Sequence, residues 1–163
     1  NFKDWIENNR HLLKPPVCNK VIYKDTEFII MVVGGPNIRK DYHVNEGEEF
    51  FYQIEGKMIL RVMKNNIPRD ITINEGEIFL LPPKIPHSPQ RYPSTVGLVI
   101  ERKRKNNELD GFQWYCDNCN HLLYEKYIFV KDIVKQLPPL FNQFWTNDKA
   151  RKCKNCSDYL KKP

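Results

Sequence analysis

Four cysteines are the first residues in this sequence whose types and spacing imply chemistry. They form two Cys-x-x-Cys pairs, Cys116 with Cys119 and Cys153 with Cys156. Two such pairs supply four thiolates in a tetrahedral, rubredoxin-like arrangement, which suits zinc or a single iron. Four sulfurs leave no coordination position open for a substrate. We therefore predict a structural metal site of iron or zinc, in which the neighbouring His121 takes no part.

A second set combines two histidines with one glutamate, His43, Glu49 and His87. Two imidazoles and a carboxylate form the facial ligand set of non-haem iron(II), which leaves adjacent positions open for a chelating substrate and dioxygen. The spacing alone also allows a simpler interpretation. Each histidine would then be an ordinary polar residue, and Glu48 and Glu49 would form a charged strand edge.

Short strands must position these residues, because apolar segments alternate with turn residues between Val21 and Glu101. Regular short strands of this kind are typical of an all-β sandwich or barrel. Several segments are apolar on both faces, which favours a sheet covered on both sides, for example by a second subunit. The expected strands are Val21–Tyr23, Glu27–Val33, Glu48–Ile54, Lys57–Met63, Asp70–Ile73, Glu77–Leu81 and Val96–Glu101.

Both ends of the chain differ from this pattern. A helix is expected from Asp4 to Leu13, with Asp4 as its cap and Lys14-Pro15-Pro16 as its end. After Lys105 the sequence predicts a loop to Cys116, a strand at Leu122–Val130 and a helix at Asp132–Asn147 that Pro138-Pro139 interrupts. We predict one domain, residues 1–163, with a barrel core at about 21–110 and a metal-pinned extension at about 111–163.

The composition excludes several classes of protein. The chain has 163 residues, of which 40% are hydrophobic, enough for a core of its own. No run of about 18 apolar residues occurs and the first residues carry no signal-peptide pattern, so we predict a cytoplasmic protein without a membrane span. Five cysteines in such a chain argue against disulfides, and the remaining Cys18 is expected in the core.

The formal net charge of +6 has three interpretations. The run Arg102–Lys105 and the basic residues between Lys149 and Lys162 could bind nucleic acid, form a solvated face, or create a mild field that attracts a small anion. Nucleic-acid surfaces interleave aromatic residues with basic ones. The run Arg102–Lys105 has no aromatic residue, so we predict no nucleic-acid partner.

Two stretches resemble the paired motifs of cupin proteins. The first runs from Gly35 to His43 and continues to Glu49 and Gly56, with Asp41 where the motif has its first histidine. The second runs from Gly76 to Pro82 and ends at His87, with Lys84 where glycine is usual. The missing histidine changes a three-histidine site into the two-histidine, one-carboxylate set, which points from cupin isomerases towards a dioxygenase.

Longer strings extend over the first two-thirds of the chain in the order found in one family. They are His11–Pro16, Val33–Asn37, Asp41–His43, Glu49–Gln53, Pro86–Arg91 and Gly97–Arg102. In these strings the sequence resembles the 3-hydroxyanthranilate 3,4-dioxygenases. The resemblance implies a cupin (double-stranded β-helix or jelly-roll) barrel with a few peripheral helices and a C-terminal four-cysteine metal knuckle. It also implies iron(II), a homodimer, and a role in NAD synthesis from tryptophan. The expected reaction converts 3-hydroxyanthranilate and O₂ to 2-amino-3-carboxymuconate 6-semialdehyde, which cyclises to quinolinate.

The resemblance also implies roles for individual residues. Arg91 would bind the substrate carboxylate, and Glu101 would accept hydrogen bonds from its amine. Arg39 would lie beside the substrate and O₂, so that Arg39 and Glu49 would be both catalytic and in contact with substrate. Asn19 is a further candidate for the pocket. Without the resemblance, Arg91 and Glu101 could form a structural ion pair, and Arg39 could be a surface residue.

Two other functions remain as alternatives. One is another cupin enzyme, such as a thiol dioxygenase or a sugar isomerase, although a planar aromatic acid explains both Arg91 and Glu101. The other, from a different class, is a zinc-ribbon protein that binds nucleic acid.

Overall fold

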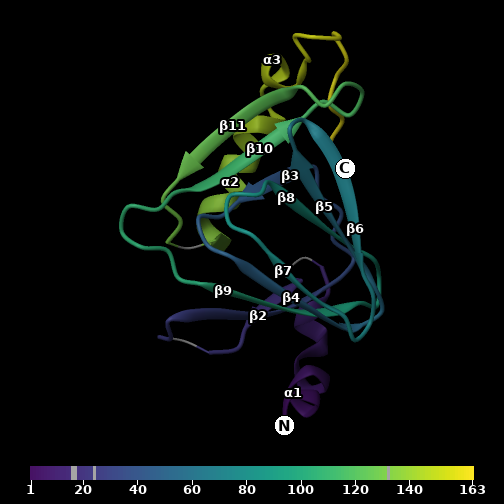
Figure 1. Ribbon diagram of the computed structural model, residues 1–163, viewed down its shortest axis with the longest axis vertical. Helices are drawn as coiled ribbons and strands as arrows, with labels where there is room; N and C mark the ends of the chain where they lie inside the picture. The colour runs from purple at the N-terminus through teal and green to yellow at the C-terminus, as the bar shows by residue number, and fades with distance from the viewer. Residues whose placement is uncertain (16–17, 24, 132) are drawn as a thin grey trace.

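The computed structural model describes residues 1–15, 18–23, 25–131 and 133–163. Within these residues the strands form two antiparallel sheets (Figure 1). The first sheet has the order β1 (Asn19–Val21), β2 (Phe28–Gly34), β9 (Val96–Arg102), β4 (Glu49–Glu55), β7 (Ile78–Leu81). The second has the order β11 (Leu122–Ile128), β10 (Asp110–Tyr115), β3 (Asp41–Val44), β8 (His87–Arg91), β5 (Met58–Lys64), β6 (Ile67–Ile73). The predicted mainly β fold class is confirmed.

The two sheets enclose a shared apolar core. Its buried side chains come from β4, β7 and β9 of one sheet and β5 and β6 of the other: Phe51, Leu81, Val99, Met58, Leu60, Val62 and Ile73. Successive side chains of a strand point to opposite faces. The alternation that turns Phe51 inward therefore also turns Glu49 and Gln53 of β4 inward, and all three are buried. Polar groups thus enter the space between the sheets on a rigid strand.

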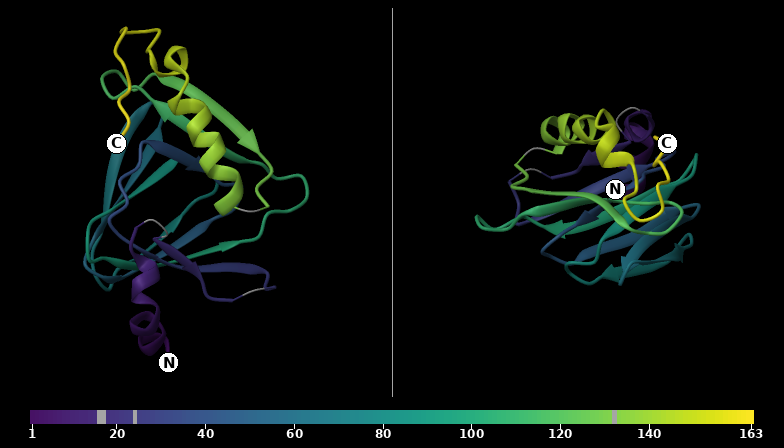
Figure 2. Two further views of the ribbon diagram at one scale, coloured as in Figure 1. Left: turned by 180° about the vertical axis from the view of Figure 1, so that it is seen from behind. Right: turned by 90° about the horizontal axis from the view of Figure 1, so that it is seen from above.

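A second apolar cluster lies under helix α2 (Ile133–Trp145). It joins the buried residues Phe112 and Trp114 of β10 to Leu140 and Phe144 of the helix and to Leu160. The rings of Trp114 and Phe144 stack with centroids 4.4 Å apart. Figures 1 and 2 show α2 against the β10–β11 pair, with the short helix α3 (Asp148–Arg151) following it. The C-terminal extension is therefore packed onto the body of the protein.

The N-terminal helix begins earlier than predicted. Helix α1 spans Phe2–Asn9 and is followed by a 3-10 helix, η1, at Arg10–Leu13. The predicted cap, Asp4, is wrong, because the Asn1 side chain accepts a hydrogen bond from the Lys3 amide and so caps the helix three residues earlier. Of the residues expected to end the helix, Pro16 lies outside the described residues.

Two further predictions fail in the C-terminal part. The loop expected before Cys116 is largely strand β10, all of whose residues are buried and which pairs with both β3 and β11. The interruption expected at Pro138-Pro139 is absent, since α2 runs through both prolines. The continuous helix buries Leu140 and Phe144, which follow the two prolines, in the apolar cluster. The expected first residue of that helix, Asp132, lies outside the described residues.

Strands β3 and β8 have polar sequences that carry little strand signal. Strand β8 reads His-Ser-Pro-Gln-Arg, yet it is nearly all buried, with partners on both sides in β3 and β5. β1 begins two residues before the expected Val21–Tyr23. Among the described helices, none has the length and apolar character needed to cross a membrane.

Candidate metal and substrate site

His43, Glu49 and His87 converge between the two sheets. β3 pairs with β8 so that His43 lies opposite His87, and β4 of the other sheet brings Glu49 to face them. One ligand atom from each of the three lies within 4.8 Å of the others. Glu49 Oε1 is 3.4 Å from His43 Nδ1, and Glu49 Oε2 is 3.2 Å from His87 Nε2. The structure thus places the three predicted ligands together.

Local hydrogen bonds prepare these side chains to hold a cation. The Ile85 carbonyl lies 2.9 Å from His87 Nδ1, so a proton on Nδ1 leaves the Nε2 lone pair free. Burial opposes ionisation of Glu49, but the charge and hydrogen bonds of His87 and His43 hold its pKa well below the usual range. Two imidazoles beside an ionised carboxylate fit iron(II). Asp41, which replaces a histidine of the cupin motif, is not part of this group.

The three ligands open onto a cavity of about 760 Å³ between the sheets. Its wall includes the other residues to which substrate roles were assigned, Arg39, Arg91, Glu101 and Asn19. Apolar side chains form much of the remaining wall, among them Met31, Val33, Phe51, Val99, Phe112 and Leu137. A cavity that is apolar around a few fixed polar groups suits a flat aromatic molecule.

Arg91 is a buried cation with one polar side-chain contact among the residues that the structure describes. Its residue is 2% exposed, and Nη1 donates to Gln53 Oε1 at 3.3 Å. Among the described residues no carboxylate forms an ion pair with it, so the structural pair with Glu101 that the sequence allowed is not formed. Burial lowers the Arg91 pKa to about 10, which keeps the guanidinium charged near neutral pH. Such a cation is available to a substrate carboxylate.

Glu101 is held by two neighbours on the cavity wall. Its Oε1 is 2.9 Å from Arg104 Nη1, and its Oε2 accepts from Asn45 Nδ2 at 2.7 Å. Burial and the nearby charge of Glu49 raise the Glu101 pKa, although Arg104 opposes them. The carboxylate is thus fixed in orientation beside the ligand group.

Arg39 is not a free surface residue. Its Nη2 and Nε both contact the carboxylate of Asp41, and the side chain is 24% exposed. The Arg39 amide and carbonyl are hydrogen-bonded to the side chain of Gln90. Asp41 therefore neutralises Arg39 at the cavity wall.

Sequence reasoning missed Arg104 and Asp110. The basic run that contains Arg104 suggests a surface that is solvated, binds nucleic acid or attracts a small anion, yet the Arg104 side chain is 5% exposed. Arg104 Nε donates to both oxygens of Asp110, at 3.0 and 2.9 Å, and Asp110 Oδ1 lies 3.3 Å from His43 Nε2. Burial opposes the charge on His43, but Asp110 and Glu49 raise its pKa to about 9. No sequence signal marked this link, because it depends on the β10–β3 register.

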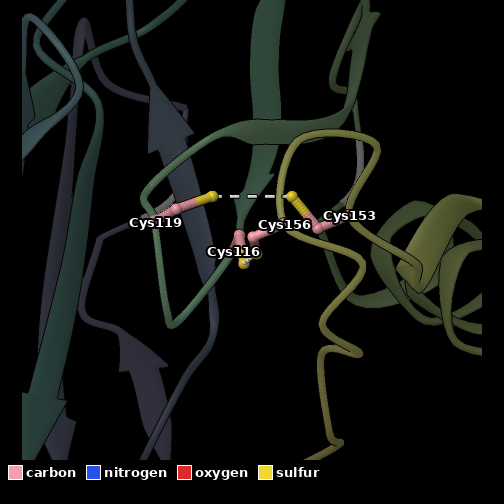
Figure 3. Close-up of side chains that lie close together, drawn as sticks. All are labelled: Cys116, Cys119, Cys153 and Cys156. Atoms are coloured by element: carbon pink, nitrogen blue, oxygen red, sulfur yellow. Dashed lines mark hydrogen bonds between the residues drawn. The ribbon is translucent and has the colours of Figure 1, made fainter.

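The four cysteines of the two pairs also converge. Their sulfurs lie within 4.8 Å of one another, and the Cys116–Cys156 and Cys119–Cys153 distances are both 3.5 Å (Figure 3). All four are free thiols. This arrangement fits one ion bound by four sulfurs.

The backbone forms matching turns around the two cysteine pairs. Asn120 N donates to the carbonyl of Cys116, and Ser157 N donates to the carbonyl of Cys153. Asn120 and Ser157 both have positive φ angles, of 58° and 65°. Each turn thereby aims its two sulfurs at the same point.

Two facing sheets with an internal His-His-Glu group define a class, the cupin-fold proteins with a site that can hold a metal. The chain belongs to the 3-hydroxyanthranilic acid dioxygenase family, whose model matches residues 1–145. Membership of this family makes it an oxygenase.

Named relatives are similar along nearly the whole chain. A 3-hydroxyanthranilate 3,4-dioxygenase of Xanthomonas euvesicatoria is 56% identical over 156 residues, 96% of this chain and 88% of that protein. The corresponding protein of Paraburkholderia phytofirmans is 48% identical over 96% of this chain and 90% of that protein. Among solved structures, a cupin-2 domain protein of Shewanella frigidimarina matches with a TM-score of 0.49 and 19% identity, covering 64% of this chain and 93% of that one.

Proposed function

We propose that the protein uses iron(II) and O₂ to open the ring of 3-hydroxyanthranilate, giving 2-amino-3-carboxymuconate 6-semialdehyde. One observation carries the proposal. A single cavity contains a two-histidine, one-carboxylate ligand group and, on its wall, a buried arginine to which no described carboxylate is paired. The names of the relatives support the same substrate. The alternative of a zinc-ribbon nucleic-acid-binding protein is not favoured.

His43, Glu49 and His87 would hold the iron, and each gives one ligand atom. When bound, iron(II) supplies a redox-active Lewis acid with open positions for a chelating substrate and for dioxygen. Phe112 stacks on the His43 ring, with centroids 5.3 Å apart, and so helps to fix the ligand's orientation.

The cavity wall orients the substrate. Arg91 binds its carboxylate through two guanidinium N–H groups, and Glu101 accepts a hydrogen bond from its amine. Arg104 and Asn45 already hold Glu101 in place. Positioning by such prearranged groups lowers the barrier because little reorganisation is needed during the reaction. Asp41 holds Arg39 through Nε and Nη2, and we assign to Nη1 of Arg39 the stabilisation of negative charge that develops on the substrate and O₂.

Ring opening tests this proposal directly. Purified protein loaded with iron(II) should convert 3-hydroxyanthranilate under air but not under argon. Oxygen-18 gas should place label in the product. Replacing His43 or Glu49 by alanine should abolish turnover with added iron(II), because a ligand is lost. Full turnover by either variant would remove this ligand group from the mechanism.

We assign the four cysteines a structural iron or zinc ion, because a site closed by four sulfurs has no open position. We place the enzyme in the cytoplasm, because a reducing compartment keeps the four thiols available as metal ligands. The site would connect the end of β10 to the segment after α3 and so tie the C-terminal segment to the second sheet.

We also propose a homodimer formed through the outer face of the first sheet. Ile78 and Leu80 are 65% and 53% exposed, and their β4 partners Tyr52 and Phe50 lie on the same face. An apolar face of this kind is typical of a subunit interface. Sedimentation should give a dimer for the native protein and a monomer for Leu80→Glu. A native monomer would contradict the assignment.

A further inference from the structure

The three arginines on the cavity wall differ in how their charges are neutralised. Arg39 is paired with Asp41, and Arg104 is paired with Glu101 and Asp110. Arg91 is the most deeply buried of the three, yet within the described residues its side-chain partner is the neutral amide of Gln53. Burying an unpaired charge costs free energy, so a position that keeps one needs a reason.

Gln53 is held so that its oxygen faces Arg91. The residue is 1% exposed, and its Nε2 donates to the Glu55 carbonyl at 2.8 Å. That bond leaves Oε1 to accept from Arg91 Nη1 at 3.3 Å. The backbone of Gln53 is fixed as well, by bonds to Glu77 and Gly76 of 3.0 and 2.8 Å. The acceptor is therefore rigid and uncharged.

Gly97 supplies the space that the guanidinium occupies. It lies opposite Gln53 in the β4–β9 register and is buried. A Cβ at this position would lie 2.5 Å from Arg91 Nη1 and 3.1 Å from both Arg91 Nη2 and Gln53 Oε1. Real side chains do not approach so closely, so any other residue here would displace Arg91.

We propose that Gln53 and Gly97 are positioning residues that keep Arg91 in place as an unneutralised cation, and that they thereby select substrates with a ring carboxylate. The inference rests on the proposed ring-opening function. An acidic residue at position 53 would form an ion pair with Arg91 and neutralise its charge, as Asp41 does for Arg39. The neutral amide fixes the guanidinium without competing with a substrate carboxylate.

The test compares 3-hydroxyanthranilate with 2-aminophenol, which keeps the neighbouring amine and hydroxyl but lacks the carboxylate. In Gln53→Glu, KM for 3-hydroxyanthranilate should rise at least about tenfold, while its kcat and the kcat/KM for 2-aminophenol change little. Gln53→Met removes the acceptor without adding charge and should raise the same KM by roughly threefold. Gln143→Glu adds the same charge on the exposed face of α2 and should change neither substrate's constants.

Equilibrium binding gives a readout that does not need turnover. Benzoate should bind the native metal-loaded protein and Gln143→Glu equally, and should bind Gln53→Glu at least about tenfold more weakly. Gly97→Ala should show the same selective loss if it remains folded by circular dichroism. If Gly97→Ala does not fold, the comparison of the two Gln53 variants decides.

The outcomes separate this inference from the proposed function. A native protein that does not open 3-hydroxyanthranilate contradicts the function itself. A native protein that opens it, together with a Gln53→Glu variant whose KM and benzoate affinity are unchanged, overturns the inference alone. Equal losses for both substrates in Gln53→Glu would also overturn it, because they indicate general damage to the site.

Discussion

The molecule holds two groups of side chains that could each hold a metal ion, and they are built differently. His43, Glu49 and His87 come from strands of both sheets. Two further buried charges support the site, since Asp110 contacts His43 and Arg104 contacts Glu101. The four cysteines come from two short turns, one after β10 and one after α3, and backbone hydrogen bonds shape each turn. The first group faces a cavity and the second closes on itself. The comparison teaches that every side chain of the open group depends on the pairing of distant strands. In the closed group local turns place each cysteine pair, and only the meeting of the two pairs depends on distant parts of the chain.

Glu49→Ala should cause the largest loss of activity and so break the first group alone. Losing the carboxylate removes a metal ligand worth several kcal/mol of transition-state stabilisation. Turnover should fall on the order of 10³-fold or more. Steady-state kinetics with excess iron(II) measures the loss. A melting temperature close to the native value shows that the fold is kept, and a loss below tenfold would contradict the ligand assignment.

Cys116→Ser with Cys119→Ser should break the second group and give the opposite pattern. Structural four-ligand sites contribute several kcal/mol or more to folding, so unfolding should occur at lower denaturant concentration. Urea titration measures this shift. The folded, iron-loaded variant should keep its kcat within about threefold, since no ligand of the open site is touched. Complete loss of turnover in that variant would refute a purely structural role.

Arg104→Met should affect stability and substrate binding together. It leaves Glu101 and Asp110 buried without their cation, and breaking such a pair costs about 3–5 kcal/mol. KM should also rise, because Glu101 loses the contact that orients it. Thermal unfolding and kinetics test the two effects. Arg102→Met, which removes the ion pair of Glu108 nearer the surface, is the matched control and should lower stability much less than Arg104→Met.

Lys40→Met should have the smallest effect, although it cuts an ion pair between the two regions. Lys40 Nζ lies 2.8 Å from Asp117, which stands between Cys116 and Cys119. The two side chains are 30% and 52% exposed, and such pairs contribute about 0–1 kcal/mol. Activity should stay within about twofold. A large loss of activity would indicate that the cysteine site and the open site are coupled through this contact.

The sequence singled out the two groups of side chains that the structure brings together, because metal-ligand chemistry constrains residue type and spacing. The Cys-x-x-Cys pairs and the His43, Glu49 and His87 set stand out in this way, and turns such as Asn65-Asn66 carry their own signal, with φ angles of 53° and 59°. The family resemblance added Arg39, Arg91 and Glu101, all of which lie on the cavity wall.

The supporting residues could not be predicted, because their partners meet only through the sheet register. Asp110 reaches His43 because β10 lies beside β3, and Gln53 meets Arg91 across the space between the sheets. Burial of Arg104 within a basic run contradicts what the run's composition suggests. The three wrong predictions have a related cause, because each followed a local sequence preference. Asn1 caps the first helix in place of Asp4, and packing produces strand β10 before Cys116 and a continuous helix through Pro138.

Metal content per chain tests the central claim most directly. Protein purified without oxygen should contain two metal ions, and mild chelation should remove one of them together with the ring-opening activity. Glu49→Ala should retain only the chelator-resistant ion, and Cys116→Ser with Cys119→Ser should retain only the labile one. A Glu49→Ala protein that still binds two ions, or native protein whose activity survives loss of the labile ion, would contradict the account.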